Sequence, residues 1–132
     1  MTSDGKLPIL SLRDIKKSYG PIQVLHGIDL DVYAGEVVAL LGENGAGKST
    51  VSNVISGTVR PSSGLMRWQG APFAPASPRE ALEAGVGMIH QELLLLPQLS
   101  IAENIFVGRY PTKAGIVDRK AMEERAEIGL QR

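Results

Sequence analysis

A glycine-rich stretch at residues 42–50 carries the residue types best suited to chemistry in this chain. It reads Gly-Glu-Asn-Gly-Ala-Gly-Lys-Ser-Thr, so that Gly42 and Gly47 stand five positions apart and are followed by Lys48 and Ser49. Glycines let successive backbone amides point at phosphate oxygens without a Cβ in the way. Lysine supplies a compact positive charge, and a serine hydroxyl can coordinate Mg²⁺. The stretch therefore predicts a loop that binds a nucleoside triphosphate with Mg²⁺.

The flanking residues predict the elements that would position this loop. Residues 37–41 are apolar throughout, which is typical of a strand covered on both faces in a parallel sheet. Residues 48–56 predict a short helix whose unpaired N–H groups and positive dipole end face the same anion. Lys48 is expected to lie against the β- and γ-phosphates. The expected nucleotide contacts are Gly42, Glu43, Asn44, Gly45, Ala46, Gly47, Lys48, Ser49 and Thr50.

The remaining pattern predicts an α/β fold in which a small N-terminal antiparallel layer joins a core of parallel strands. Residues 28–32 alternate strictly between apolar and charged types, as expected of an antiparallel strand with one face in water. Further elements are expected from capping residues, glycines and apolar runs. They are a strand at 65–69, a helix at 77–84, a buried strand at 86–90, a helix opened by a capping box at 100–103, and a helix at 120–130.

The composition excludes several other classes of protein. The chain has 132 residues with 14 basic and 14 acidic side chains, so no overall positive field would attract nucleic acid. It has no cysteine and only two histidines, which argues against disulfides and thiolate or histidine metal sites. No apolar run reaches the roughly 18 residues needed to cross a bilayer. The N-terminus does not resemble a secretory signal, so a cytoplasmic location is expected by default.

Beyond the glycine loop, residues 8–130 resemble the ATP-binding subunits of ABC transporters. The run Ile-Lys-Lys-Ser-Tyr-Gly at 15–20 and the stretch 24–36 resemble the antiparallel start of those domains, where an aromatic side chain stacks on adenine. The resemblance assigns that role to Tyr19. Gln91 resembles the family's Q-loop glutamine, which implies a role in positioning Mg²⁺ and the attacking water. The residues after Gln91 would then contact a membrane permease.

Within that family, residues 90–109 are similar to the branch that imports monosaccharides such as ribose, galactose or xylose. This resemblance implies ATP and Mg²⁺ as ligands and a position at the cytoplasmic face of the membrane, as a peripheral subunit. It also implies three partners: the permease, a second nucleotide-binding domain and, indirectly, a periplasmic or extracellular sugar-binding protein.

Several of the family's hydrolytic motifs do not occur in the sequence. There is no Leu-Ser-Gly-Gly-Gln signature, no apolar strand ending in Asp-Glu (Walker B), and no switch histidine after it. We therefore expect residues 1–132 to be the N-terminal part of one nucleotide-binding domain, with residues 1–8 flexible. Such a chain is expected to bind ATP without hydrolysing it, whereas the whole protein would be an ATPase.

Three alternatives remain open at this point. A kinase or GTPase of the P-loop type would share the glycine loop and a parallel sheet, although the chain lacks the Asn-Lys-x-Asp guanine reader of GTPases. An ABC subunit could serve a cargo other than sugar, because the permease and its binding protein select the cargo. In an interaction module, the glycine turn would be structural and nucleotide would not stabilise the protein.

Overall fold

The computed structural model describes residues 7–90 and 95–131, which fall into two compact units, Met1–Ile89 and His90–Arg132. Residues 1–6, which make up most of the segment expected to be flexible, lie outside the described residues. No helix among the described residues is both long and apolar enough to cross a membrane.

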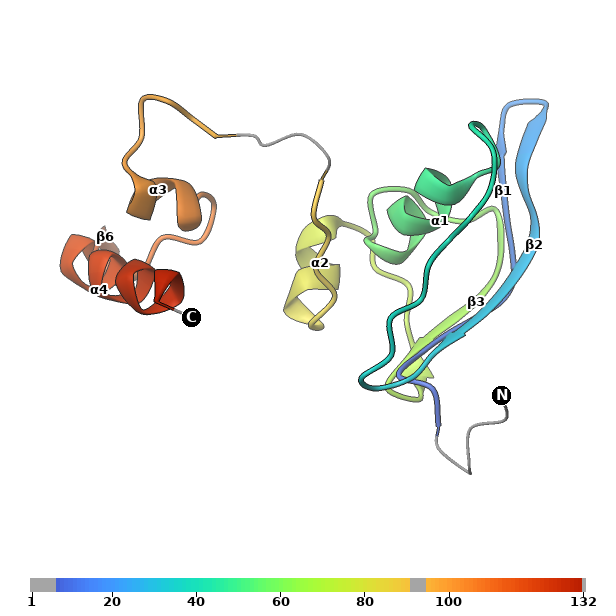
Figure 1. The fold of residues 1–132 in the computed structure, drawn as a ribbon, viewed down its shortest axis with the longest axis horizontal. Coiled ribbons are helices and arrows are strands. Elements are labelled where there is room, and N and C mark those ends of the chain that lie inside the picture. Colours follow the sequence, from blue (N-terminus) through green and yellow to red (C-terminus); the bar gives the residue numbers. More distant parts are fainter. Residues whose placement is uncertain (1–6, 91–94, 132) are drawn as a thin grey trace. The chain divides into compact units, whose positions relative to one another are not determined.

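The first unit is built on a four-stranded antiparallel sheet in the order β2-β1-β3-β4. The long hairpin of β1 (Leu10–Tyr19) and β2 (Ile22–Val32) confirms the antiparallel layer predicted near the N-terminus. On its other edge, β1 pairs with β3 (Ser63–Trp68), and β3 pairs with the short β4 (Ala71–Pro72). Figure 1 shows the hairpin as the longest feature of this unit.

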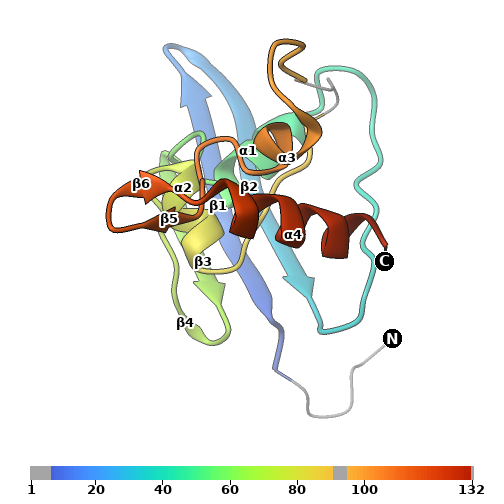
Figure 2. The ribbon, with the colours of Figure 1, turned by 90° about the vertical axis from the view of Figure 1, so that its left-hand side faces the viewer.

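Two helices lie on the same face of this sheet, as Figures 1 and 2 show from perpendicular directions. The first is α1 (Lys48–Ile55), which buries Val51 and Val54. The second, α2 (Pro78–Glu83), begins at a serine cap as predicted, because the Ser77 hydroxyl accepts a hydrogen bond from the Glu80 amide. Side chains that are almost fully buried form the centre of the core between helices and sheet: Leu12, Ile15, Leu25 and Val54.

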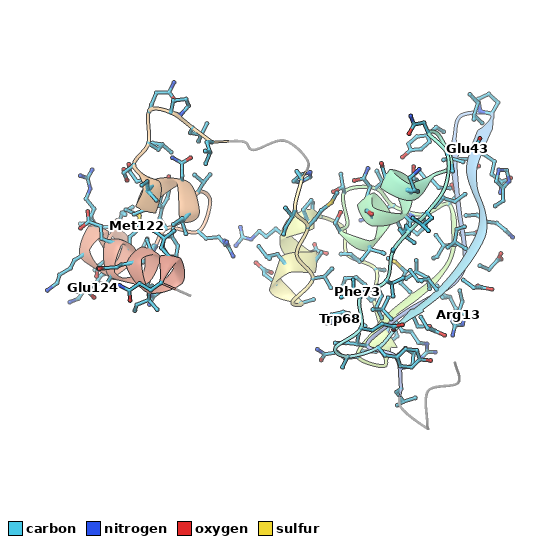
Figure 3. All side chains as sticks on the ribbon, in the orientation of Figure 1. Arg13, Glu43, Trp68, Phe73, Met122 and Glu124 are labelled. Atoms are coloured by element: carbon cyan, nitrogen blue, oxygen red, sulfur yellow. The ribbon has the colours of Figure 1, made fainter. Side chains whose placement is uncertain are left out.

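An aromatic pair lies between the sheet and α2. The rings of Trp68 and Phe73 are 6.3 Å apart between centroids, and both are labelled in Figure 3. The Trp68 indole N–H donates to the carbonyl of Ala84, the C-cap residue of α2, at 2.8 Å. Aromatic pairs of this geometry add about 0.5 to 1.5 kcal/mol beyond the area that they bury. Packing therefore accounts for both side chains.

The structure differs from the sequence prediction at the two expected parallel strands. Residues 37–41 and 86–90 form no strand, and within the described residues neither segment has a partner strand. Val37, Leu41 and Ile89 are 96%, 92% and 98% exposed. An apolar run becomes a strand only when neighbouring strands satisfy its backbone groups. The apolar pattern is therefore present here without the hydrogen-bonding partners that it requires.

The second unit contains α3 (Ile101–Ile105), the short hairpin β5 (Thr112–Lys113) and β6 (Ile116–Val117), and α4 (Arg119–Leu130). The predicted capping box is confirmed, since the Ser100 hydroxyl accepts from the Glu103 amide and the Glu103 carboxylate accepts from the Ser100 amide. A small core of Ala102, Met122 and Ala126 joins α3 to α4, and Met122 is labelled in Figure 3.

Candidate phosphate-binding site

Gly47 fixes the point at which the glycine-rich loop becomes helix α1. Its φ of +86° lies in the left-handed region that favours glycine. A Cβ built on Gly47 would lie 2.7 Å from Leu25 Cδ2 and 3.2 Å from the Val24 carbonyl oxygen. The absence of a side chain therefore lets the start of α1 approach β2 closely. This contact places the loop against the hairpin.

The side chain of Lys48 lies inside the loop. Its ammonium group donates to the carbonyl oxygens of Gly42 and Glu43, both at 2.7 Å. The Ala46 amide donates to the Glu43 carbonyl at 3.1 Å, which closes a turn around the ammonium. Figure 3 labels Glu43 in this loop. Two loop carbonyl oxygens therefore hold the Lys48 ammonium group against the loop.

The start of α1 adds backbone donors to that charge. The first helical hydrogen bond runs from the Val51 amide to the Gly47 carbonyl at 2.9 Å. The amides of Lys48, Ser49 and Thr50 precede it and have no partner among the described residues. These are the donors that a helix N-terminus leaves unpaired, and the helix dipole favours an anion beside them.

These residues fit the chemistry of a nucleoside triphosphate. The triphosphate offers only acceptor oxygens and negative charge, whereas the loop offers N–H donors, an ammonium group and the exposed Ser49 residue. Phosphate oxygens would have to replace the two carbonyl oxygens that now accept from Lys48. That exchange would strengthen the hydrogen bonds of Lys48, because an anionic acceptor makes a stronger hydrogen bond to an ammonium group than a neutral carbonyl does.

Tyr19 is the last residue of β1, just before the turn that leads into β2. Its residue is 47% exposed, and the Lys17 ammonium lies 5.0 Å from the centre of its ring. Lys17 pairs with Leu25, and paired residues of an antiparallel ladder share one face of the sheet. Leu25 is the residue that contacts Gly47, so Tyr19 and the start of α1 lie on the same face of the hairpin.

Of the residues singled out in the sequence, 42–50 form one continuous loop and helix start, and Tyr19 ends β1. Gln91 lies outside the described residues, and its proposed role with Ser49 at Mg²⁺ stays a prediction. Sequence reasoning missed Lys17. The signal was available, because residues two apart on a strand lie on the same face, and Lys17 and Tyr19 have that spacing.

Solved structures identify the fold as that of an ATP-binding cassette. One crystal structure of an ATP-binding cassette of an ABC transporter matches 96% of this chain and 54% of its own chain, with a TM-score of 0.80 and 26% identity. A nucleotide-free ATP-binding cassette matches 95% of this chain and 52% of its own, with a TM-score of 0.75 and 25% identity. The expected fold class, a truncated ATP-binding cassette core with an antiparallel layer, is therefore confirmed, although the two parallel strands expected in that core do not form among the described residues.

Sequence comparison gives the family. The family model described as ABC transporter matches residues 25–132, so the chain belongs to the ABC transporter family. The ribose import ATP-binding protein RbsA of Yersinia pestis is 43% identical over 128 residues, which are 97% of this chain and 25% of RbsA. The fructose import ATP-binding protein FrcA of Rhizobium meliloti is 45% identical, over 93% of this chain and 50% of FrcA. The chain thus spans 25% of the length of its ribose import relatives.

Proposed function

We propose that this chain is the ATP-binding part of an ABC-type importer and that residues 42–50 hold the triphosphate. The observation that carries the proposal is the arrangement around Lys48, whose ammonium group is held by two loop carbonyls while the first amides of α1 have no partner among the described residues. Membership of the ABC transporter family supports it. A structural glycine turn would not require the lysine to point into the loop.

Each predicted site residue has a role in this proposal. Lys48 neutralises charge on the β- and γ-phosphates, while the loop amides fix the phosphate oxygens. Ser49 and Gln91 would hold Mg²⁺, which shields the phosphate oxygens when bound. Tyr19 provides a flat apolar surface for the adenine on the same face of the hairpin as the loop. ATP and Mg²⁺ are thus the proposed ligands.

The proposed cargo is a sugar, and the proposed setting is the cytoplasmic face of the membrane. The names of the ribose and fructose import relatives support this reading. The proposed partners of the whole protein are permease subunits that contact the region after Gln91, a second nucleotide-binding domain and, through the permease, an extracytoplasmic sugar-binding protein. The energy of ATP binding and hydrolysis would drive transport through the permease.

We also propose that residues 1–132 form the N-terminal part of one nucleotide-binding domain. The sequence contains no Asp-Glu strand to hold Mg²⁺ and to activate water. By itself, the chain would then bind ATP without hydrolysing it. The solved cassettes support the proposal that the chain is part of a domain, because the chain matches only 54% and 52% of their length.

Calorimetry with Mg·ATP tests the proposal. We expect Lys48→Ala to weaken binding by about tenfold or more, because a hydrogen bond to a charged group contributes about 1.5 to 3 kcal/mol. Lys113→Ala, which removes an exposed lysine from β5, serves as the control and should leave the affinity unchanged. If the folded protein gives no binding heat, or if Lys48→Ala binds as well as the unsubstituted protein, the proposal is wrong.

A further inference from the structure

Lys17 is held in place by two contacts at once. Its ammonium group lies 5.0 Å from the centre of the Tyr19 ring and donates to the Arg60 carbonyl oxygen at 2.8 Å. The segment around Arg60 is itself tied to the end of β1, since the Ser62 amide donates to the Lys16 carbonyl and the Ser18 amide donates to the Ser62 hydroxyl. The cation therefore has a fixed position over the ring.

This arrangement makes the two faces of the Tyr19 ring different. A cation over an aromatic ring is attracted by the negative charge on the ring face and occupies that face. A planar base also needs a ring face on which to stack. Because Lys17 lies over one face, a base that stacks on Tyr19 would have to use the opposite face. The half-exposed state of Tyr19 shows that part of the ring surface remains accessible.

We propose that Lys17 is a positioning residue for nucleotide binding: its ammonium group covers one face of the Tyr19 ring and so directs the adenine to the other face. The inference rests on the proposed function, because it assumes that a nucleotide base stacks on Tyr19. Lys17 acts through Tyr19 and does not itself contact the nucleotide. The Arg60 carbonyl contributes by holding the ammonium group over the ring.

A different role for Lys17 would follow from the same geometry if its charge attracted phosphate. Lys17 shares a face of the hairpin with the start of α1, so a contact with the triphosphate has to be tested. The two roles differ in the ligand to which they respond. A positioning role requires a base, whereas a charge role requires only phosphates. Inorganic tripolyphosphate, which has the charge and lacks the base, separates them.

The test measures the affinities of Mg·ATP and Mg·tripolyphosphate for variants of the protein as it occurs naturally. We expect Lys17→Met to weaken ATP binding about two- to fivefold and to leave the tripolyphosphate affinity unchanged. Lys17→Arg keeps a cation over the ring and should retain the ATP affinity. Lys16→Met removes a neighbouring lysine that pairs with Asp14, and it should affect neither ligand. In a Tyr19→Ala background, Lys17→Met should have no further effect on ATP.

Three results would overturn the inference: equal weakening of both ligands by Lys17→Met, unchanged ATP affinity in that variant, or an undiminished effect in the Tyr19→Ala background. Melting temperatures of all variants separate loss of binding from loss of folding, and Lys17→Arg tests the charge if Lys17→Met unfolds. Failure of the unsubstituted protein to bind ATP would contradict the proposed function itself. If the unsubstituted protein binds ATP and Lys17→Met leaves the ATP affinity unchanged, only the inference about Lys17 is contradicted.

Discussion

At the scale of single residues, Gly47 links the fold to the candidate site. Its left-handed backbone opens helix α1, and its missing side chain allows the close contact with Val24 and Leu25. Gly45 also has a left-handed backbone, with a φ of +90°, but a Cβ there would meet nothing within 4 Å. A substitution at Gly45 would therefore introduce backbone strain alone, whereas one at Gly47 would introduce backbone strain and a steric clash.

We expect Gly47→Ala to destabilise the protein more than Gly45→Ala. The left-handed conformation costs an alanine about 1 to 2 kcal/mol at either position. At Gly47, the added Cβ would also crowd the buried Leu25 side chain and the Val24 carbonyl oxygen, and overpacking of this kind adds about 1 to 3 kcal/mol. Urea unfolding of both variants measures the difference. Equal free energies of unfolding would show that α1 does not depend on this contact.

At the scale of secondary structure, local signals were sufficient for helices, which satisfy their own hydrogen bonds, and for a strand paired within one hairpin. The alternation at 28–32 predicted β2, and the helix predicted at 48–56 appears as Lys48–Ile55, with Gly57 after it at a φ of +73°. Ser77 and Ser100 cap the two helices that they were expected to begin. Neighbouring residues supply the donors and acceptors that define each helix, and β1, the other strand of the hairpin, supplies those of β2.

The sequence was insufficient where an element depends on distant partners. The apolar run at 37–41 would be buried only if neighbouring strands flanked it. The residues of the run do not determine whether such strands are present. The β5–β6 hairpin was missed for another reason. Its turn consists of Ala114 and Gly115, both with positive φ, and alanine is a weak signal for such a turn. Lys17 escaped notice because a lysine on a strand usually faces solvent without a specific partner.

The start of helix α3 should make the second unit sensitive to acid. The Ser100 backbone amide and then its hydroxyl lower the pKa of the Glu103 carboxyl group below its ordinary value. A carboxyl group with a lowered pKa in the folded state stabilises that state above its unfolded pKa of about 4.3. This contribution is lost as the pH falls through the folded pKa. The unit containing α3 should therefore lose stability in that range.

Substitution of Glu103 isolates this effect. We expect Glu103→Gln to reduce the loss of stability of residues 95–131 on acidification from pH 5 to pH 3, as measured by amide hydrogen exchange. Glu123→Gln, which changes an exposed carboxylate of α4, is the control and should retain the full pH dependence. If both variants keep the same acid sensitivity, the capping carboxylate is not its source.

At the scale of the whole molecule, the two units differ in the apolar surface that they bury. The first has a core of nine buried residues from sheet and helices, whereas the core of the second consists of Ala102, Met122 and Ala126. The first unit also leaves apolar side chains of 37–41 in contact with water. Unpaired backbone groups beside exposed apolar side chains are the usual starting point for association between chains.

The 132-residue chain should therefore associate with itself at high concentration. We expect sedimentation velocity to show dimers or larger species, because pairing of residues 37–41 between copies would bury Val37 and Leu41. A double variant, Val37→Lys with Leu41→Lys, places like charges on this segment and should shift the chain toward monomer. The matched control, Ile128→Lys with Leu130→Lys, changes exposed apolar residues of α4 and should leave association unchanged. A monomeric profile of the unsubstituted chain at high concentration would show that the exposed segment is tolerated in water. Reduced association in both double variants would show that added charge alone keeps the chains apart.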